Sequence, residues 1–222
     1  MIINQDKKFI FIEVPKTGTS AIASMLLRAD PTTQRNTLPL LGGGSTVVST
    51  HISYREIAQI LGDKTNAYTY VAFLRNPLDL VISKYYFYKL GRAWHQVQDG
   101  TASQRLTARV RFARMTPLPI WAALYPYKST NRFVIDEDDR VKIQYIGDFD
   151  QLQDNVRRIF SNFSYAPEDL RLEWENKSVY EADKIPFLNM TKWIVALKSR
   201  KDFQLYERVI KNAQATFSEP VS

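Results

Sequence analysis

The sequence predicts an α/β fold with a central, mainly parallel sheet flanked by helices. Two apolar runs, Phe9–Val14 and Tyr68–Leu74, each end in a loop that is followed by apolar residues at helical spacing. Further helical patterns fill the second half of the chain, and neither an internal repeat nor a long linker interrupts them. Strands that alternate with helices are typical of a parallel sheet. We therefore expect a single domain, residues 1–222.

The segment Phe9–Val14 is expected to be a central strand, because it is apolar except for Glu13 and so suits burial on both faces of a sheet. The residues after the next loop recur at helical spacing. They are Ile22, Met25, Leu26 and Ala29. Pro31 then ends this helix, since proline cannot continue the pattern of helical hydrogen bonds.

A glycine-rich loop is expected at Leu41–Thr46, and it precedes a short helix that is expected to begin near His51. Ser53 is the expected cap of this helix, because Glu56 stands three residues later, as in a capping box. The second strand, Tyr68–Leu74, is rich in aromatic and β-branched residues. Pro77 follows it at a position that suits the first turn of a helix. The strand–loop–helix order therefore occurs twice.

The second half of the chain carries further helical patterns and one hairpin pattern. Helices are expected at Ser103–Met115, Asp150–Phe160, Pro186–Leu197 and Lys201–Ala213. Two apolar segments, Phe133–Ile135 and Arg140–Ile146, flank the acidic run Asp136–Asp139, which predicts a hairpin with an acidic turn. Because this run lacks the spacing of a calcium loop, we expect no metal there.

The composition is that of an ordinary globular protein, with 45% hydrophobic and 24% charged residues. The sequence has no cysteine, which excludes disulfides and thiolate metal sites. No apolar run approaches the roughly 20 residues that cross a bilayer, and the first residues are too polar for a secretory signal. We therefore expect a soluble, cytoplasmic protein.

The net charge of +7 suits an anionic ligand. Five arginines and a single acid, Asp99, lie in the segment from Arg92 to Arg114. We interpret this segment either as a solvated helical face or as a basic surface near the entrance of an anion site. The sequence contains no zinc finger, RNA-binding aromatic motif or basic zipper, so nucleic acid is not the expected partner.

The loop after the first strand has the composition of an anion site. It holds a lysine, a glycine and three hydroxyl residues in the order Pro15-Lys16-Thr17-Gly18-Thr19-Ser20. The start of the following helix offers backbone N–H groups and a partial positive charge, and Lys16 adds a full charge. We therefore expect a phosphate or sulfate group here. Thr19 and Ser20 are also candidates for the helix cap.

The loop after the second strand adds a basic partner. This strand ends in Arg75, whose forked guanidinium suits direct recognition of a phosphate. Ser83 lies eight residues later and is expected to bring a hydroxyl to the same anion. A triphosphate loop would place its lysine after a second glycine and would need a metal-binding aspartate. The two loops therefore predict a site that binds two anionic groups without a metal.

Two motifs resemble those of sulfotransferases. The segment Val14–Ser20 is similar to their 5′-phosphosulfate loop, and Arg75–Ser83 is similar to their 3′-phosphate motif. Three further segments resemble the carbohydrate-type branch of the family. They are His51–Tyr54, Tyr145–Leu152 and Asn176–Ser178. Residues 91–130 match poorly, and Leu80 stands where many members carry an arginine.

The resemblance implies transfer of the sulfuryl group of 3′-phosphoadenosine 5′-phosphosulfate (PAPS) to a hydroxyl or amine, with release of adenosine 3′,5′-bisphosphate (PAP). It implies that Lys16 contacts the bridging oxygen of the leaving phosphate and offsets the charge that grows there. The residues implied to cradle the 5′-phosphate are Thr17, Gly18, Thr19 and Ser20. Those implied to bind the 3′-phosphate are Arg75 and Ser83, while Lys177 and Ser178 would close over the donor.

His51 matches the candidate base of the family. Such a base takes the proton of the acceptor as its oxygen or nitrogen attacks sulfur in line with the leaving phosphate. An imidazole, with an ordinary pKa of about 6.5, suits this role near neutral pH. Glu13 is the second candidate, because it adjoins the loop. His95 lies in the poorly matching region and is expected on the substrate side or at the surface.

The sequence therefore predicts a sulfotransferase with a P-loop-like three-layer α/β fold. We expect PAPS as donor, no metal, a saccharide or small-metabolite acceptor, and neither nucleic acid nor a membrane as partner. Two alternatives stay open. One is a P-loop nucleotide kinase or triphosphatase with Asp148 as the magnesium-binding acid, and the other is a non-catalytic anion-binding module. No motif identifies the acceptor or the oligomeric state.

Overall fold

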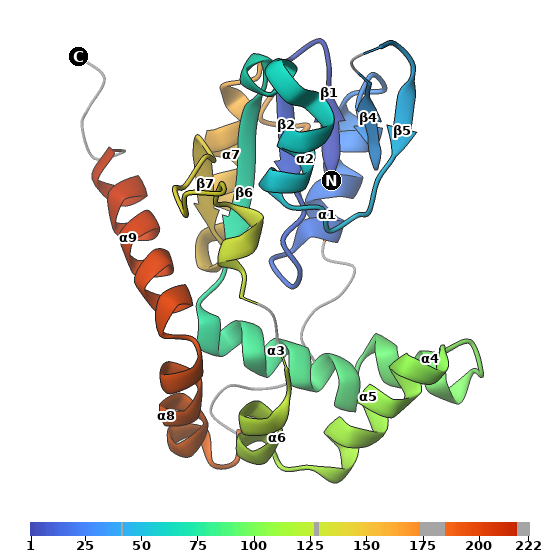
Figure 1. Ribbon diagram of the computed structural model, residues 1–222, viewed down its shortest axis with the longest axis vertical. Coiled ribbons are helices and arrows are strands. Elements are labelled where there is room, and N and C mark those ends of the chain that lie inside the picture. The colour runs from blue at the N-terminus through green and yellow to red at the C-terminus, as the bar shows by residue number, and fades with distance from the viewer. Residues whose placement is uncertain (41, 127–128, 174–184, 217–222) are drawn as a thin grey trace. The chain divides into compact units, whose positions relative to one another are not determined.

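The computed structural model describes residues 1–40, 42–126, 129–173 and 185–216 (Figure 1). Contacts within the chain divide it into two compact units. The first unit comprises Met1–Arg75, Thr130–Glu175 and Leu205–Ser222, and the second comprises Asn76–Ser129 and Asn176–Gln204. Because each unit combines segments that are distant in the sequence, no single point along the chain separates them.

The first unit is built on a five-stranded mixed sheet with the strand order β3-β1-β2-β6-β7. The strands are β1 (Ile2–Asn4), β2 (Phe9–Ile12), β3 (Gln34–Arg35), β6 (Thr69–Leu74) and β7 (Tyr145–Asp148). Strands β2, β6 and β7 are parallel, with Phe11 opposite Val71 and Val71 opposite Tyr145. Their carboxyl ends therefore lie at one edge of the sheet. The expected α/β class is confirmed.

Strands β1 and β3 are antiparallel to their neighbours and are not predicted from the sequence. Only residues 5–8 join β1 to β2, a connection too short for parallel strands, and Lys8 adopts a φ of +53° in this turn. The two strands are three and two residues long, which is too short to display a period of two. The sheet is therefore mixed rather than purely parallel.

Helices cover both faces of this sheet. The first unit contains α1 (Thr19–Ala29), α2 (Tyr54–Leu61), α7 (Leu152–Ser161) and the part of α9 (Arg200–Thr216) from Leu205 onward. Phe9 and Phe11 of β2 pack with α1 and α7, whereas Ile10 and Ile12 pack with α2 and with Leu205 of α9. All four β2 side chains are completely buried. The prediction of a central strand that is covered on both faces is therefore confirmed.

Local sequence signals set several boundaries in this unit. Helix α1 ends at Ala29, before Pro31, as predicted. Helix α2 begins with the predicted capping box, because the Glu56 N–H donates to Ser53 Oγ at 3.4 Å and the Ser53 N–H donates to Glu56 Oε2 at 2.7 Å. The glycine-rich loop differs from the prediction at its end, since Ser45 and Thr46 belong to a strand, β5 (Ser45–Val47). A second, two-stranded sheet pairs β4 (Thr37–Pro39) with β5 (Ser45–Val47).

The predicted hairpin around the acidic run is reduced to a tight turn. A single antiparallel bridge joins Ile135 to Val141, and the Asp136 N–H donates to the Arg140 carbonyl at 2.9 Å. The Asp136 carboxylate accepts the N–H groups of Asp138 and Arg140, so the acidic side chain organises its own turn. Short 3₁₀ helices complete the unit at Gly62–Ala67, Asn131–Phe133 and Phe149–Gln151.

The second unit is helical. Its helices are α3 (Pro77–Lys89), α4 (Arg92–Gln98), α5 (Gln104–Met115), α6 (Leu118–Leu124) and α8 (Leu188–Lys198). Pro77 occupies the first turn of α3, as predicted. The core of the second unit is aromatic. The rings of Trp121 and Tyr125 are stacked with their centres 4.3 Å apart, and Tyr85 lies edge-on to Trp121. In the described ranges, none of the helices combines the length and the hydropathy that crossing a membrane requires.

Candidate functional site

The loop between β2 and α1 is shaped by two left-handed residues. Lys16 has a φ of +68° and Gly18 a φ of +72°, whereas Thr17 between them is not left-handed. The buried Thr17 hydroxyl donates to the Val14 carbonyl at 2.9 Å and fixes the loop against the end of the strand. Alternation of this kind turns successive backbone N–H groups to one side, which is the geometry of an anion-binding nest.

Helix α1 starts directly after this loop. Its cap residue is Gly18, and within the described part of the chain no side chain caps its first turn. The hydrogen bond from the Ile22 N–H to the Gly18 carbonyl, at 3.2 Å, is the first of the helical pattern. The N–H groups of Thr19, Ser20 and Ala21 come before it, in the first turn of the helix. Neither Thr19 nor Ser20 is therefore the cap. The end of the helix presents N–H donors and a partial positive charge to a ligand.

Gly18 is required by both its backbone and its surroundings. A Cβ atom at this position would lie 2.6 Å from Leu152 Cδ2 and 3.4 Å from Phe149 Cε2. The φ of +72° also disfavours any residue with a Cβ. The glycine thus allows the loop to approach the start of α7 and the residues just after β7.

Lys16 and Arg75 bring two positive charges to this loop. Arg75 follows β6, and its Nη1 donates to the Lys16 carbonyl at 3.4 Å. Burial, and to a smaller extent the positive charge of Arg75, lower the pKa of Lys16 from 10.5 to about 8. Two neighbouring cations in a partly buried site disfavour each other, so an anion between them would relieve the repulsion.

Phe149 is a site residue that sequence reasoning missed. The Arg75 guanidinium carbon lies 4.2 Å from the centre of the Phe149 ring, so the ring supports the planar group by a cation–π contact. The signal that could have found it is positional. Phe149 comes directly after β7, and the carboxyl ends of parallel strands meet at one edge of a sheet.

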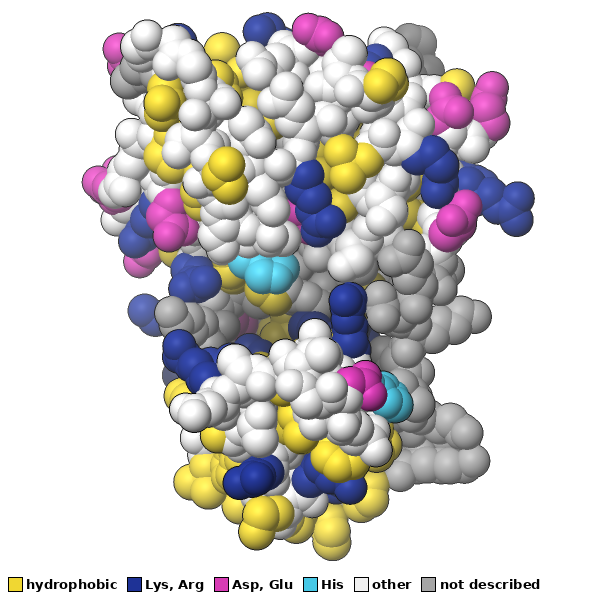
Figure 2. Space-filling view, turned by 90° about the vertical axis from the view of Figure 1, so that its right-hand side faces the viewer, with side chains coloured by type: hydrophobic (Ala, Val, Ile, Leu, Met, Phe, Trp, Pro, Cys, Tyr) yellow, Lys and Arg dark blue, Asp and Glu magenta, His cyan; other side chains and the backbone are white. Residues whose placement is uncertain are grey.

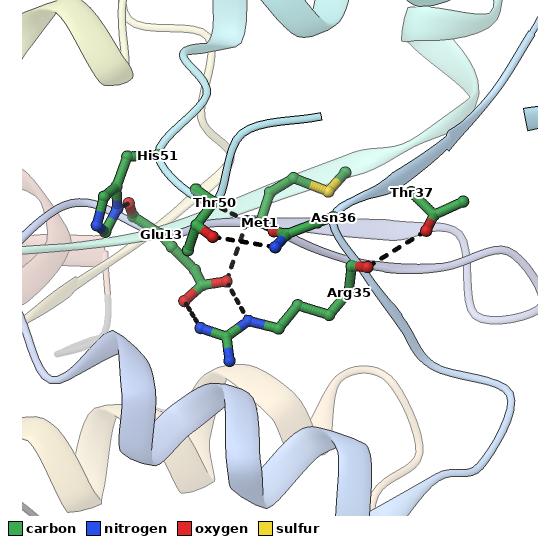
Figure 3. Close-up of polar contacts among 7 residues, drawn as sticks. All are labelled: Met1, Glu13, Arg35, Asn36, Thr37, Thr50 and His51. Carbon is green, nitrogen blue, oxygen red and sulfur yellow. Dashed lines mark hydrogen bonds and ion pairs between the residues drawn. The ribbon is translucent and has the colours of Figure 1, made fainter. Parts of the chain in front are cut away.

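His51 lies beside the carboxyl end of β2 (Figure 3). Its Nδ1 is 2.7 Å from the backbone carbonyl oxygen of Glu13. Because a carbonyl can only accept, Nδ1 carries the hydrogen, and Nε2 of the neutral ring keeps its lone pair. The side chain is exposed, so this basic nitrogen is accessible to a second molecule. One hydrogen bond thus fixes both the tautomer and the orientation of the imidazole.

The Glu13 carboxylate has a different setting (Figure 3). It is 1% exposed and accepts two bonds from Arg35, at 3.0 Å from Nε and 2.7 Å from Nη2. Its Oε1 also lies 3.0 Å from the Met1 amine. A buried carboxylate whose oxygens are engaged by two cationic groups has little access to an incoming acceptor group. Glu13 contributes to the site through its backbone carbonyl.

The remaining predicted residues lie elsewhere or are not described. Ser83 belongs to α3 in the second unit and is 5% exposed. His95 is exposed on α4 of the same unit. Lys177 and Ser178 lie outside the described residues. The first unit therefore brings together His51, Lys16, Gly18, Arg75 and Phe149.

The acid proposed for the triphosphatase alternative is engaged in local hydrogen bonds. Asp148 Oδ1 accepts the Tyr206 hydroxyl at 2.9 Å and the Asp150 N–H at 3.1 Å. Over the residues that the structure describes, no cluster of three or more His, Asp or Glu side chains is placed to hold a metal ion.

No family model, curated protein or solved structure matches this chain.

Proposed function

We propose that the protein is a sulfotransferase that uses PAPS as donor and has a P-loop-like fold. One observation carries the proposal. The carboxyl ends of the neighbouring parallel strands β2 and β6 deliver Lys16 and Arg75 to one loop, where Arg75 Nη1 lies 3.4 Å from the Lys16 carbonyl. A donor with phosphate groups at both ends needs cations of this kind around a backbone nest.

The loop fits a 5′-phosphosulfate better than a triphosphate. Lys16 precedes the glycine at the turn, so its ammonium enters from the opposite side to the lysine of a triphosphate loop. The second strand is followed by Arg75 rather than by a metal-binding aspartate. Thr17, Gly18, Thr19 and Ser20 would hold the 5′-phosphate, while Arg75, supported by Phe149, would bind the 3′-phosphate.

In the proposed transfer, the acceptor oxygen or nitrogen forms a bond to sulfur while the bond from sulfur to the phosphate oxygen breaks. His51 Nε2 takes the acceptor proton, because Nδ1–H is committed to the Glu13 carbonyl. The imidazolium that forms keeps this hydrogen bond. Lys16 offsets the negative charge that grows on the leaving phosphate oxygen. The buried, ion-paired Glu13 carboxylate is the weaker candidate for the base.

The test separates donor binding from proton transfer. His51→Ala should abolish sulfuryl transfer and leave PAP affinity within about twofold of the parent protein, since a base contributes about 10²–10⁴-fold to the rate. The matched control is His95→Ala, which replaces the other exposed histidine and should retain activity. Arg75→Ala should weaken PAP binding by at least about tenfold, because it removes a charged hydrogen-bond partner. Full activity in the His51 variant would refute the assignment of the base.

A second experiment addresses the whole proposal. PAP binding is measured by calorimetry beside ATP turnover with and without magnesium. Magnesium-dependent ATP turnover without PAP binding would favour the kinase or triphosphatase alternative and would overturn the sulfotransferase. If PAP binds, a screen for sulfuryl transfer from PAPS to sugars, phenols, amines and small alcohols would identify the acceptor. PAP binding without transfer to any acceptor would favour a non-catalytic module.

A further inference from the structure

Large hydrophobic side chains at the surface are concentrated on two helices of the second unit. Helix α6 exposes Ile120 by 50% and Leu124 by 65%, and α8 exposes Met190 by 49%, Trp193 by 67% and Leu197 by 63%. We call these five residues the apolar patch. Met115 and Phe187, which are exposed by 84% and 65%, flank the two helices. An exposed apolar surface of this kind marks an interaction site in a folded protein.

The outer faces of the two helices carry large apolar side chains. Helix α6, Leu-Pro-Ile-Trp-Ala-Ala-Leu, contains no polar side chain, although Ala123 and Leu124 are exposed. In α8 the buried residues Thr191 and Val195 face the core, while the apolar residues of the patch repeat at spacings of three and four on the other side. A surface helix normally carries charged or polar residues on its outer face. Both helices therefore present a face that suits an apolar environment.

The two helices form one surface element. They pack against each other, and Lys198 of α8 donates to the carbonyls of Ala122, Ala123 and Tyr125 at the end of α6, at 2.9, 2.6 and 3.2 Å. This ammonium group both closes the carboxyl end of α6 and ties it to α8. The exposed side chains of the two helices are thus held in a fixed relation within the second unit.

The same unit is strongly basic. Its described residues include eleven lysines and arginines but only three acids. The cations are Lys84, Lys89, Arg92, Arg105, Arg109, Arg111, Arg114, Lys192, Lys198, Arg200 and Lys201, and the acids are Asp79, Asp99 and Asp202. These residues carry an excess of eight positive charges (11 − 3), whereas the net charge of the whole sequence is +7. Figure 2 shows Lys and Arg side chains next to hydrophobic ones on the face of this unit that it draws.

We propose that the second unit docks on an anionic lipid bilayer, with the apolar patch among the acyl chains near the headgroups and cations of the same unit on the lipid phosphates. Trp193 and Leu197 are typical of surfaces that enter this interface, and lysine and arginine stems extend along apolar surface while their charges stay in water. Anionic lipids attract nearby cations within about one Debye length. The proposal replaces the sequence-based expectation that no membrane takes part, and it does not depend on the proposed enzymatic activity.

Two other partners fit the apolar patch and the charge of the second unit less well than a bilayer. A second copy seated on the same face would bring two strongly positive units together, which like-charge repulsion disfavours. A nucleic acid would complement the charge, but its interfaces are polar and would leave the patch of Ile, Leu, Met and Trp without a role. A bilayer with anionic headgroups satisfies the charge and the apolar surface together.

The test measures co-sedimentation of the full chain with vesicles of phosphatidylcholine alone or with about 30% phosphatidylglycerol. We expect binding to the anionic vesicles only, with a loss of at least about tenfold in half-molar salt, where the Debye length is about 4 Å. Equal binding to both kinds of vesicle, or no binding to either, would overturn the proposal. Binding of RNA or formation of a dimer, with no vesicle binding, would do the same.

Two sets of variants locate the surface. One variant combines Met190→Ser, Trp193→Ser and Leu197→Ser. This triple variant should bind vesicles at least about tenfold more weakly, because the substitutions remove most of the apolar surface that enters the lipid. The matched control, Leu27→Ser with Val47→Ser, removes exposed apolar side chains from the first unit and should change binding by less than about twofold. Thermal melts of both variants show whether they are folded.

A fluorescence measurement does not depend on those variants. Brominated lipids quench a tryptophan that lies among acyl chains, and Trp193→Phe keeps the site apolar. We expect most of the lipid-dependent quenching of the parent protein to disappear in this variant. Quenching that is unchanged in Trp193→Phe would place another tryptophan in the lipid and would refute docking through α8.

Discussion

Replacement of Lys16 by methionine tests the electrostatic description of the site. The folded protein lowers the pKa of Lys16 from 10.5 to about 8, so its positive charge opposes folding. At about 1.4 kcal/mol per pKa unit, the difference corresponds to an upper limit of about 3 kcal/mol. Solvent around the partly exposed side chain screens this cost, and we expect Lys16→Met to stabilise the protein by about 1–2 kcal/mol at pH 7. Methionine keeps the apolar stem and is subject to the same left-handed backbone conformation.

The pH dependence gives this prediction a definite sign. Below pH 8 the lysine is charged in both the folded and the unfolded chain, so the full cost of burying the charge is present. Between about pH 8 and 10.5 the folded chain binds fewer protons than the unfolded one, and the parent protein gains stability relative to Lys16→Met. The difference between the two proteins should therefore be constant up to pH 8 and shrink to near zero above 10.5.

Urea denaturation of both proteins from pH 6 to 10.5 measures this difference, with circular dichroism as the signal. PAP binding by the variant should fall by at least about tenfold at pH 7, because a charged contact is lost while the fold becomes more stable. Destabilisation by Lys16→Met at pH 7, or a difference in stability that does not narrow at high pH, would show that burial of the Lys16 charge does not oppose folding.

Three further substitutions test particular contacts. Gly18→Ala should destabilise the protein by about 2–4 kcal/mol in urea titrations and weaken PAP binding, because its Cβ would meet Leu152 at 2.6 Å and the residue has a left-handed φ. Wild-type stability in that variant would contradict the loop geometry. Gly147→Ala should cost about 3 kcal/mol or more, since its Cβ would lie 2.3 Å from the fully buried Phe73 ring, and an unchanged melting temperature would be the contrary result. Ser53→Ala should cost about 1 kcal/mol by loss of the cap on α2, with a thermal melt as the measurement and Ser53→Asp as the variant that should restore stability.

The elements that could be predicted from the sequence are those fixed by short-range geometry. Ser53 and Glu56 are three residues apart, and that spacing alone places each side chain on the backbone of the other. Pro77 suits a first helical turn because it lacks an N–H group. The apolar run at Phe9–Ile12 requires burial on both faces, which only a central strand provides. The order of lysine, glycine and hydroxyl residues before α1 likewise indicates an anion loop without any distant partner.

Which distant groups meet at that loop depends on the packing of the folded chain. Glu13 and His51 are the two candidate bases that the sequence offers, but β3 brings Arg35 to the Glu13 carboxylate while the Glu13 carbonyl orients His51. Phe149 reaches Arg75 because β6 and β7 are parallel neighbours. Strands β1 and β3 are too short to show a recognisable strand pattern in the sequence. Contacts across tens of residues depend on strand order and register, which are set by the packing of the whole sheet. The sequence alone therefore determined the chemical character of the anion loop, and the packing of the sheet determined which side chains serve it.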